Sequence, residues 1–132
     1  MVDRSSTTHP DAPGPVNGVL IWTTAERYPA LASFYRDTLG LPVRTDRPGH
    51  LAIEWPNGMR LTLGIHTELS GAATDPLRIM INLAVIDIAR TAAHLRHHGV
   101  TFTREPSQEP RGGWIATFRD PDGNVVQLLQ PS

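Results

Sequence analysis

Short segments with apolar and β-branched residues alternate along the chain with two longer segments of helical spacing. Residues 17–24 (NGVLIWTT) predict a strand, and residues 29–39 predict a helix that ends at Gly40, with Pro42 preventing its continuation. Three further strands are predicted over residues 43–46, 50–54 and 60–66, with Pro56-Asn57-Gly58 as the turn between the last two. The first half therefore has the order strand, helix, three strands.

The second half repeats this order. A strand is predicted over residues 78–85, Asp87 is suited to cap a helix over residues 88–98, and Gly99 ends it. Strands follow over residues 100–105, 114–118 and 124–130, with a turn at Pro121-Asp122-Gly123. Neither half of such a repeat closes a core alone. The pattern predicts an α+β domain over residues 16–132, built from two tandem βαβββ modules (16–66 and 77–130), a linker (67–76) and a flexible N-terminal tail (1–15).

Composition excludes several classes of function. The 132 residues carry a formal net charge of −1, whereas nucleic-acid binders usually have a basic excess. The chain has no cysteine and no lysine, which excludes zinc–thiolate sites, thiol catalysis and a lysine Schiff base with pyridoxal phosphate. No apolar run approaches the roughly 18 residues that a membrane span needs, and the first residues lack the order of a signal peptide. We therefore expect a cytoplasmic protein that contacts neither nucleic acid nor membrane.

Three segments resemble a known family. They are FYRDTLGL (residues 34–41), AVIDIARTAAHLRHHGV (84–100) and GGWIATFRDPDGNVVQLLQ (112–130). Taken in this order, they resemble the glyoxalase/bleomycin-resistance/dioxygenase (vicinal oxygen chelate) superfamily. The resemblance implies that the two modules form curved mixed sheets around a cup. It does not specify a function, because the family includes isomerases, dioxygenases, epimerases, thiol transferases and drug-sequestering proteins.

Catalytic members of the family hold a divalent metal with His, Glu or Gln from the first and last strands of the modules. Transferred to this chain, those positions fall on Gly18 or Leu20, Thr62, Met80 and Gln127. Only Gln127 offers a suitable oxygen ligand, since methionine is too soft for such a metal. We therefore expect no metal cofactor. The alternative is a displaced divalent-metal site formed by Glu54, His66 and Gln127.

A second candidate for metal binding lies on the predicted second helix. His94 and His98 have the i, i+4 spacing of a metal-binding pair, but no glutamate lies between them. With His97 beside them, they are better explained as part of a solvent-exposed helix face.

Strand alternation predicts which side chains line the cup. The predicted ligand-binding residues are Trp22, Arg60, Thr62, His66, Met80, Asn82 and Gln127, with Trp114 near the mouth. The tryptophans offer flat faces for stacking, and Arg60 suits an anionic group. Alternatively, Trp22 and Met80 only fill the cup, and Arg60 only pairs with Glu54 across the strands. Ile21, Leu63, Ile81 and Leu83 are expected to face the helices. No residue is identified as catalytic.

Three hypotheses follow. The first is a small-molecule binding protein that sequesters a planar or apolar ligand in a metal-free cup, as the resemblance to bleomycin-resistance and related antibiotic-resistance proteins implies; a homodimer follows from the same resemblance. The second is a metal-dependent lyase, isomerase or dioxygenase with a non-standard ligand set. The third is an interaction module whose cup is filled by its own side chains. The sequence leaves open whether the protein is an enzyme.

Overall fold

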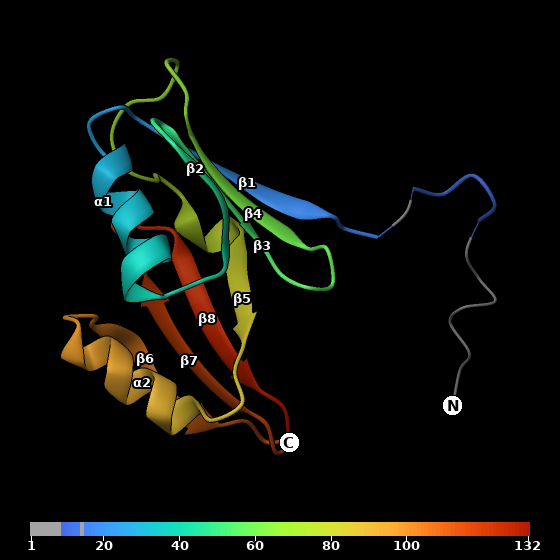
Figure 1. The fold of residues 1–132 in the computed structure, drawn as a ribbon. Coiled ribbons are helices and arrows are strands. Elements are labelled where there is room, and N and C mark those ends of the chain that lie inside the picture. The colour runs from blue at the N-terminus through green and yellow to red at the C-terminus, as the bar shows by residue number, and fades with distance from the viewer. Residues whose placement is uncertain (1–8, 14) are drawn as a thin grey trace.

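The computed structural model describes residues 9–13 and 15–132. Two β-sheets and two α-helices follow the predicted repeat (Figure 1). The first half contains β1 (Gly18–Thr23), α1 (Tyr28–Ser33), β2 (Val43–Arg47), β3 (His50–Glu54) and β4 (Arg60–Ile65). The second half contains β5 (Met80–Ala84), α2 (Ile88–His97), β6 (Phe102–Gln108), β7 (Trp114–Arg119) and β8 (Val125–Gln130). Residues 1–8 and 14 of the predicted tail lie outside the described residues.

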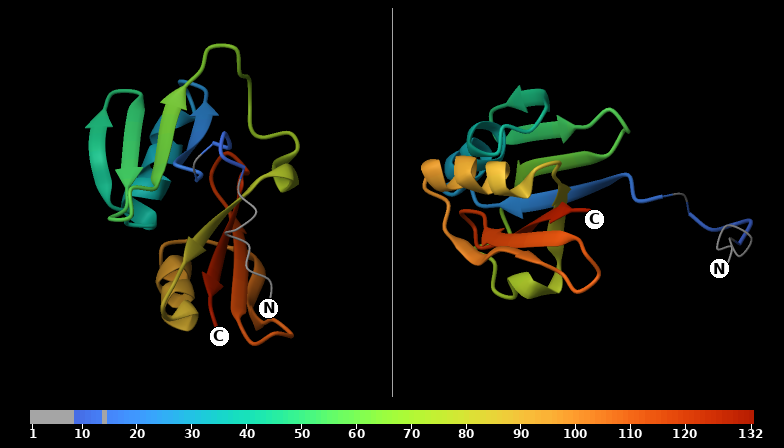
Figure 2. Two further views of the ribbon diagram at one scale, coloured as in Figure 1. Left: turned by 90° about the vertical axis from the view of Figure 1, so that its right-hand side faces the viewer. Right: turned by 90° about the horizontal axis from the view of Figure 1, so that it is seen from below.

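Each module forms one four-stranded mixed sheet. The first sheet has the strand order β1-β4-β3-β2, and the second has the order β5-β8-β7-β6. In both, the first strand of the module is parallel to its last strand, while the remaining pairs are antiparallel. The two sheets lie in different halves of the molecule, with α1 between them (Figures 1 and 2). The predicted fold class, with two βαβββ modules, is confirmed.

The predicted ends of the helices are also confirmed. The side chain of Asp87 accepts a hydrogen bond from the amide of Arg90 at 3.1 Å, which caps α2. Gly40 and Gly99 have positive φ angles of 65° and 88°, a conformation that L side chains rarely adopt and that suits the residue after a helix.

The sequence did not predict three local features. The predicted first helix continues beyond α1 as a π-helical segment (Phe34–Thr38), in which the amide of Leu39 donates to the carbonyl of Phe34 at 2.8 Å. A short 3-10 helix (Pro76–Arg78) ends the linker. Strand β6 extends to Gln108, beyond the predicted end at residue 105, because this edge strand accommodates Pro106 at a place where its pairing with β7 shifts register.

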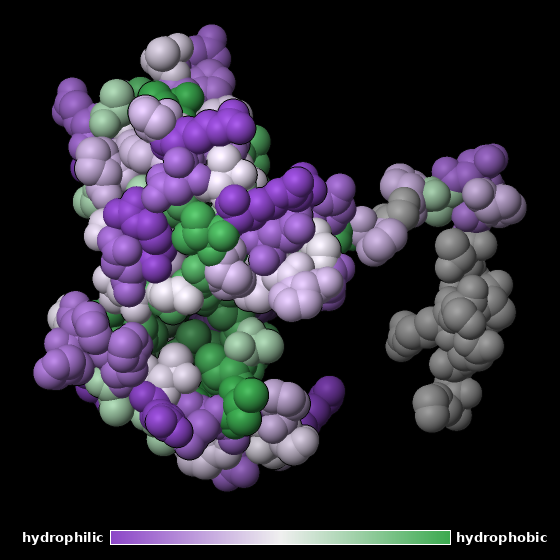
Figure 3. Space-filling view, in the orientation of Figure 1, coloured by the Kyte–Doolittle hydropathy of each residue, from purple (hydrophilic) through white to green (hydrophobic). Residues whose placement is uncertain are grey.

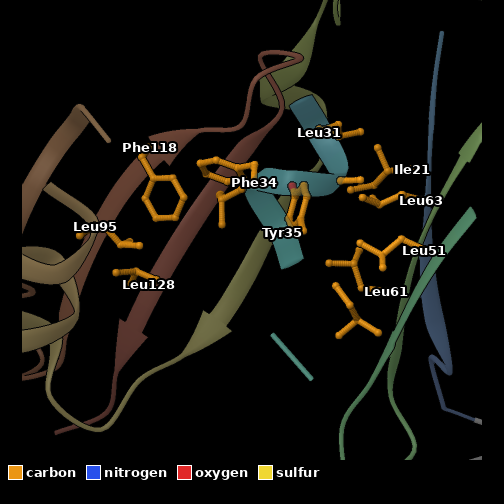
Figure 4. Packing of buried hydrophobic residues seen from close by; sticks show 14 of the residues in the cluster. Ile21, Leu31, Phe34, Tyr35, Leu51, Leu61, Leu63, Leu95, Phe118 and Leu128 are labelled. Carbon is orange, nitrogen blue, oxygen red and sulfur yellow. The ribbon is translucent and has the colours of Figure 1, made fainter. Parts of the chain in front are cut away.

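The two modules share one hydrophobic core. Leu31 and Tyr35 are fully buried, and Leu31 lies toward the first sheet, near Ile21 and Leu63 (Figure 4). Phe34 points the other way, with its ring centroid 6.0 Å from that of Phe118 on β7. Because Leu31 packs toward the first sheet and Phe34 toward the second, this helical segment joins the two modules.

A buried polar cluster reinforces the same junction. The Tyr35 hydroxyl donates to the Asp120 carboxylate at 2.8 Å, and Asp120 also accepts bonds from the amides of Asp122 and Asn124 and from the Asn124 side chain. The Thr23 hydroxyl at the end of β1 donates to Asp122, and Arg27 lies 3.6 Å from that carboxylate. The turn between β7 and β8 is thereby tied to β1 and to the segment after α1.

Burial sets the protonation behaviour of this cluster. It raises the pKa of Asp120, while hydrogen bonds from Asn124 and Tyr35 act in the opposite direction. Burial also raises the pKa of Tyr35 well above its ordinary value, so its hydroxyl keeps the proton that it donates.

No helix among the described residues has the length and apolar character needed to cross a membrane.

Replacing Tyr35 with Phe tests the junction between the modules. The variant removes a hydrogen bond to a buried carboxylate, and we expect the free energy of unfolding to fall by about 1.5–3 kcal/mol. Tyr28→Phe is the matched control, since the buried Tyr28 hydroxyl has no hydrogen-bond partner among the described residues. We expect that control to change stability little. Urea denaturation followed by circular dichroism measures both, and equal losses for the two variants would contradict the role given to Tyr35.

Candidate functional site

Each sheet has one face packed on the helices and the core and one face that points away from them, which we call the outer face. On the first sheet, the register places six outer-face residues on the neighbouring strands β1 and β4: Gly18, Leu20, Trp22, Arg60, Thr62 and Gly64. The intervening residues Ile21, Leu61 and Leu63 are buried in the core. Three of the predicted ligand-binding residues, Trp22, Arg60 and Thr62, therefore share one surface.

Trp22 forms a flat aromatic platform on this surface. A Cβ atom added to Gly64 would lie 2.7 Å from the Trp22 ring, so the indole lies directly against the backbone of β4. His66 packs edge-on against the ring, with centroids 5.2 Å apart and planes at 78°. Trp22 nevertheless stays 45% exposed, which leaves much of the ring open to a ligand.

A shallow cavity of about 610 Å³ lies over this platform. Its lining includes Trp22, Leu20, Thr62, His50 and Arg60. Gly18 and Gly64 also line it: Gly64 lies beneath the indole, and Gly18 lies beside Arg60 at the opposite end. The lining is therefore mostly apolar, with an aromatic ring at one end and a cation at the other, which suits a small organic molecule.

His66 lies at the Trp22 end of this surface, and Glu68 of the following loop approaches both of its ring nitrogens. Its Nδ1 accepts a hydrogen bond from the amide of Glu68 at 3.1 Å, and its Nε2 lies 3.9 Å from the Glu68 carboxylate. The structure thus gives the imidazole a role in orienting Trp22.

Arg60 shares a carboxylate with a second arginine at the other end of the surface. One oxygen of Glu54 accepts from Nε of Arg60 at 2.5 Å and from Arg44 at 2.6 Å. The hydrogen bonds from Arg60 and then Arg44 lower the pKa of Glu54. The expected cross-strand pairing of Arg60 with Glu54 is therefore present, but it does not neutralise both guanidinium groups.

The outer face of the second sheet is neutral along β5 and β8, whereas the neighbouring strand β7 carries Arg119 as the register partner of Val125. This face carries Met80, Asn82 and Ala84 on β5 beside Val125, Gln127 and Leu129 on β8. The Gln127 amide donates to the Thr117 hydroxyl on β7 at 3.3 Å. Asn82 and Gln127 are register partners, so two amide groups lie together in an otherwise apolar surface.

The predicted residues do not line one cup within the chain. Trp22 and Thr62 line the cavity on the first sheet, whereas Met80 and Asn82 line a larger cavity of about 730 Å³ between the two modules. Only Arg60 among them borders both cavities. Trp55 and Met59 also line the inter-module cavity; strand alternation does not predict them, because they follow β3 in a turn. Figure 3 shows apolar side chains lining a hollow in this region.

Trp114 lies elsewhere. It pairs with Gln130, and it shares a face with Ala116 and Phe118, which are buried in the core. The Gln130 side chain accepts from the first amide of α2 at 2.7 Å, which marks this face as the helix side of the sheet. The expected position near the mouth of the cup was wrong, because strand parity puts Trp114 on the opposite face from Gln127.

The proposed alternative metal ligands are not brought together. Glu54 pairs with Arg60 at one end of β4, and His66 follows the other end, six residues or about 20 Å along the strand. Gln127 lies on the second sheet. Within residues 9–13 and 15–132, no group of three or more His, Asp or Glu side chains is arranged to hold a metal ion. At the family's ligand positions, Gly18 or Leu20 has no side-chain donor and Met80 is too soft for a hard divalent cation, which leaves only the neutral oxygens of Thr62 and Gln127.

The histidines of α2 lie at its exposed C-terminal end. The ring centroids of His94 and His98 are 4.4 Å apart, and Nδ1 of His98 lies 2.9 Å from the carbonyl of His94. This contact occupies one nitrogen of the candidate pair with the helix backbone.

Comparisons with known proteins agree on the family. The model of the Glyoxalase/Bleomycin resistance protein/Dioxygenase superfamily matches residues 21–128. Similar solved structures include a superfamily member from Sphaerobacter thermophilus, with 24% identity, a TM-score of 0.68 and coverage of 90% of this chain and 98% of the other. Lactoylglutathione lyase from Agrobacterium tumefaciens has 19% identity, a TM-score of 0.69 and coverage of 90% and 95%.

A third similar structure is TnmS3, an antibiotic binding protein from Streptomyces sp. CB03234. It has 27% identity and a TM-score of 0.69, and the match covers 92% of this chain and 98% of that one. No curated protein matches the chain.

Replacing Gly64 with Ala tests how the Trp22 platform is formed. The added methyl group has no room beneath the indole, so we expect the ring to be displaced. The near-ultraviolet circular dichroism of the variant should differ from that of the wild type, and most of this difference should vanish when the same substitution is made in a Trp22→Phe background. An unchanged spectrum in the Trp22-containing protein would contradict the close packing of Trp22 on Gly64.

Replacing Glu54 with Gln tests whether the ion pairs of the Glu54 carboxylate stabilise the fold in a pH-dependent way. A carboxyl group whose pKa is lowered on folding stabilises the fold above its unfolded pKa, and this contribution is lost as the pH falls through its folded pKa. We therefore expect the variant to melt below the wild type near neutral pH, with the gap closing in acid. Thermal melts across pH measure the gap. Glu26→Gln is the control, because Glu26 enters none of the ion pairs among the described residues. A gap for Glu54→Gln that does not vary with pH would refute the pairing.

Proposed function

The chain belongs to the glyoxalase/bleomycin-resistance/dioxygenase superfamily, and we propose that it is a small-molecule binding protein that takes up a planar, largely apolar ligand without a metal ion. The observation that carries this proposal is the Trp22 platform, which packs directly against Gly64 while the residue stays 45% exposed. A planar ring stacked there buries apolar area and gains the favourable geometry of aromatic pairs.

The donor set supports binding over metal-dependent chemistry. The family's metal would polarise vicinal oxygens of a substrate as a Lewis acid, which requires several hard ligands in one place. Here the family's positions carry a glycine or leucine, a threonine and a methionine beside Gln127. We derive no catalytic step through a metal at these positions.

The exposure of the outer faces argues against a cup filled by its own side chains. Leu20 is 50% exposed, Trp22 45% and Met80 40%. Side chains that filled a cavity would be buried by one another, whereas these large apolar groups remain accessible. The similarity to an antibiotic binding protein also supports the proposal, since that relative covers nearly the whole chain.

We also propose a homodimer. The cavity on the first sheet is shallow, and the outer face of the second sheet lies apart from it, so each chain presents two incomplete halves of a site. Strands β1 and β5 are both at sheet edges, and exposed apolar residues flank β5 at Leu77, Ile79 and Ile86. A second copy would cover these edges and bring two unlike half-sites together. The cytoplasmic location stays a prediction.

Native mass spectrometry of the protein as purified tests the proposed function and assembly together. We expect a dimer without a bound transition metal, and an organic adduct on it would give the mass of a natural ligand. One transition-metal ion per chain would contradict the metal-free proposal and favour a lyase, isomerase or dioxygenase. A monomer would contradict the proposed assembly.

Replacing Trp22 with Ala tests the platform itself. We expect the variant to bind the neutral planar probe anthracenemethanol about tenfold more weakly, because the stacking surface is removed. Trp114→Ala is the matched control. Trp114 is similarly exposed, at 37%, but it lies on the second sheet, on the face that packs on the helix. Fluorescence anisotropy of the probe measures the affinities. A wild-type protein that fails to bind, or equal losses in the two variants, would refute the proposed site.

A further inference from the structure

The outer face of the first sheet carries an excess of positive charge. Arg60 lies on β4, Arg47 pairs with His50 on the same face, and Arg44 reaches Glu54 from β2. Among the strand residues of this face, all of which the structure describes, Glu54 is the only carboxylate. The chain as a whole has a net charge of −1, so this concentration of arginine is a local feature.

The shared carboxylate leaves one of the charges uncompensated. Arg44 and Arg60 both donate to the same oxygen of Glu54, so the three groups together carry one positive charge. Arg60 uses its Nε–H for this bond, and its two terminal nitrogens make no hydrogen bond with any described residue. Its side chain is half exposed, and Arg60 lines the cavity that contains Trp22. The two terminal nitrogens of this guanidinium present N–H donors that suit a carboxylate or a sulfonate.

The distance between the two ends of the surface limits the ligand. Trp22 is the register partner of Gly64, which lies four residues from Arg60 along β4, or about 13 Å. Leu20 and Thr62 lie between these ends and offer mainly apolar contact. A molecule that touches both ends must be elongated, with an aromatic end and an end that can accept hydrogen bonds.

We propose that the ligand is an anionic aromatic compound, with its planar rings stacked on Trp22 and its acidic group bound by Arg60 at the opposite end of the same surface. This assignment rests on the proposed function and adds the charge of the ligand and its orientation. Glu54 acts against the anion, because it draws on the Arg60 guanidinium and contributes a negative charge beside the acidic group.

A matched pair of probes separates the anion subsite from the proposed function. Anthracene carboxylate and anthracenemethanol, substituted at the same ring position, differ in charge but share the ring that stacks on Trp22. We expect the wild-type protein to bind the carboxylate more tightly, and we expect added salt to reduce that preference. Fluorescence anisotropy of the probes measures both affinities.

Two variants should move the affinity for the anion in opposite directions. Arg60→Gln should weaken binding of the carboxylate about tenfold, and Glu54→Gln should strengthen it several-fold, because the two guanidinium groups lose their competing partner. Neither should change binding of the neutral probe by more than about twofold. Arg90→Gln, on an exposed position of α2 far from this face, is the control and should alter neither affinity.

Each result separates the two proposals. Equal binding of the two probes by the wild type, or an Arg60→Gln protein that keeps the wild-type preference, would overturn the anion subsite and leave the planar-ligand site standing. Weaker binding of the carboxylate by Glu54→Gln would overturn the competing role of that residue and the subsite built on it. Failure of both probes to bind would overturn the proposed function and the anion subsite together.

Discussion

The buried carboxylate of Asp120 accepts hydrogen bonds from Tyr35 after α1 and from the backbone and side chain of Asn124 in the β7–β8 turn. This bonding fixes the second sheet to the helical segment that also packs on the first sheet. Leu31 of the same segment lies near Ile21 and Leu63 of the first sheet, whereas Phe34 lies on the side of the second sheet, so any shift of this segment would move both modules at once (Figure 4). The positions of the two outer faces and of the cavity between the modules depend on that junction.

The outer faces of this chain differ in chemistry from those of the family's metal-binding members, because other residues stand here at the metal-binding positions. Glycine or leucine, threonine and methionine stand at those positions, and the proposed recognition rests instead on stacking on Trp22 and on a partly compensated arginine. The second sheet contributes neutral amides, Asn82 and Gln127, among apolar residues. In the proposed dimer, apposition of the two unlike faces would place Arg60 on one side of a ligand and the neutral amides of β5 and β8 on the other.

Much of this fold could be predicted from the sequence because its determinants are local. The cap at Asp87, the glycines after the helices and the alternation along β1 and β4 act over a few residues, and the predicted faces of Ile21 and Leu63 followed directly. The site was harder to predict. Trp114 was placed on the wrong face because its orientation depends on its register with Gln130, and the separation of the half-sites depends on how two modules pack across α1.

A crystal structure of the protein grown with anthracene carboxylate tests the central claim most directly. We predict that the rings lie against Trp22, the carboxylate contacts Arg60 and no metal ion bridges the ligand to the protein. Density for the probe in the inter-module cavity beside Trp55 and Met59, or on a metal ion held by protein side chains, would contradict the claim.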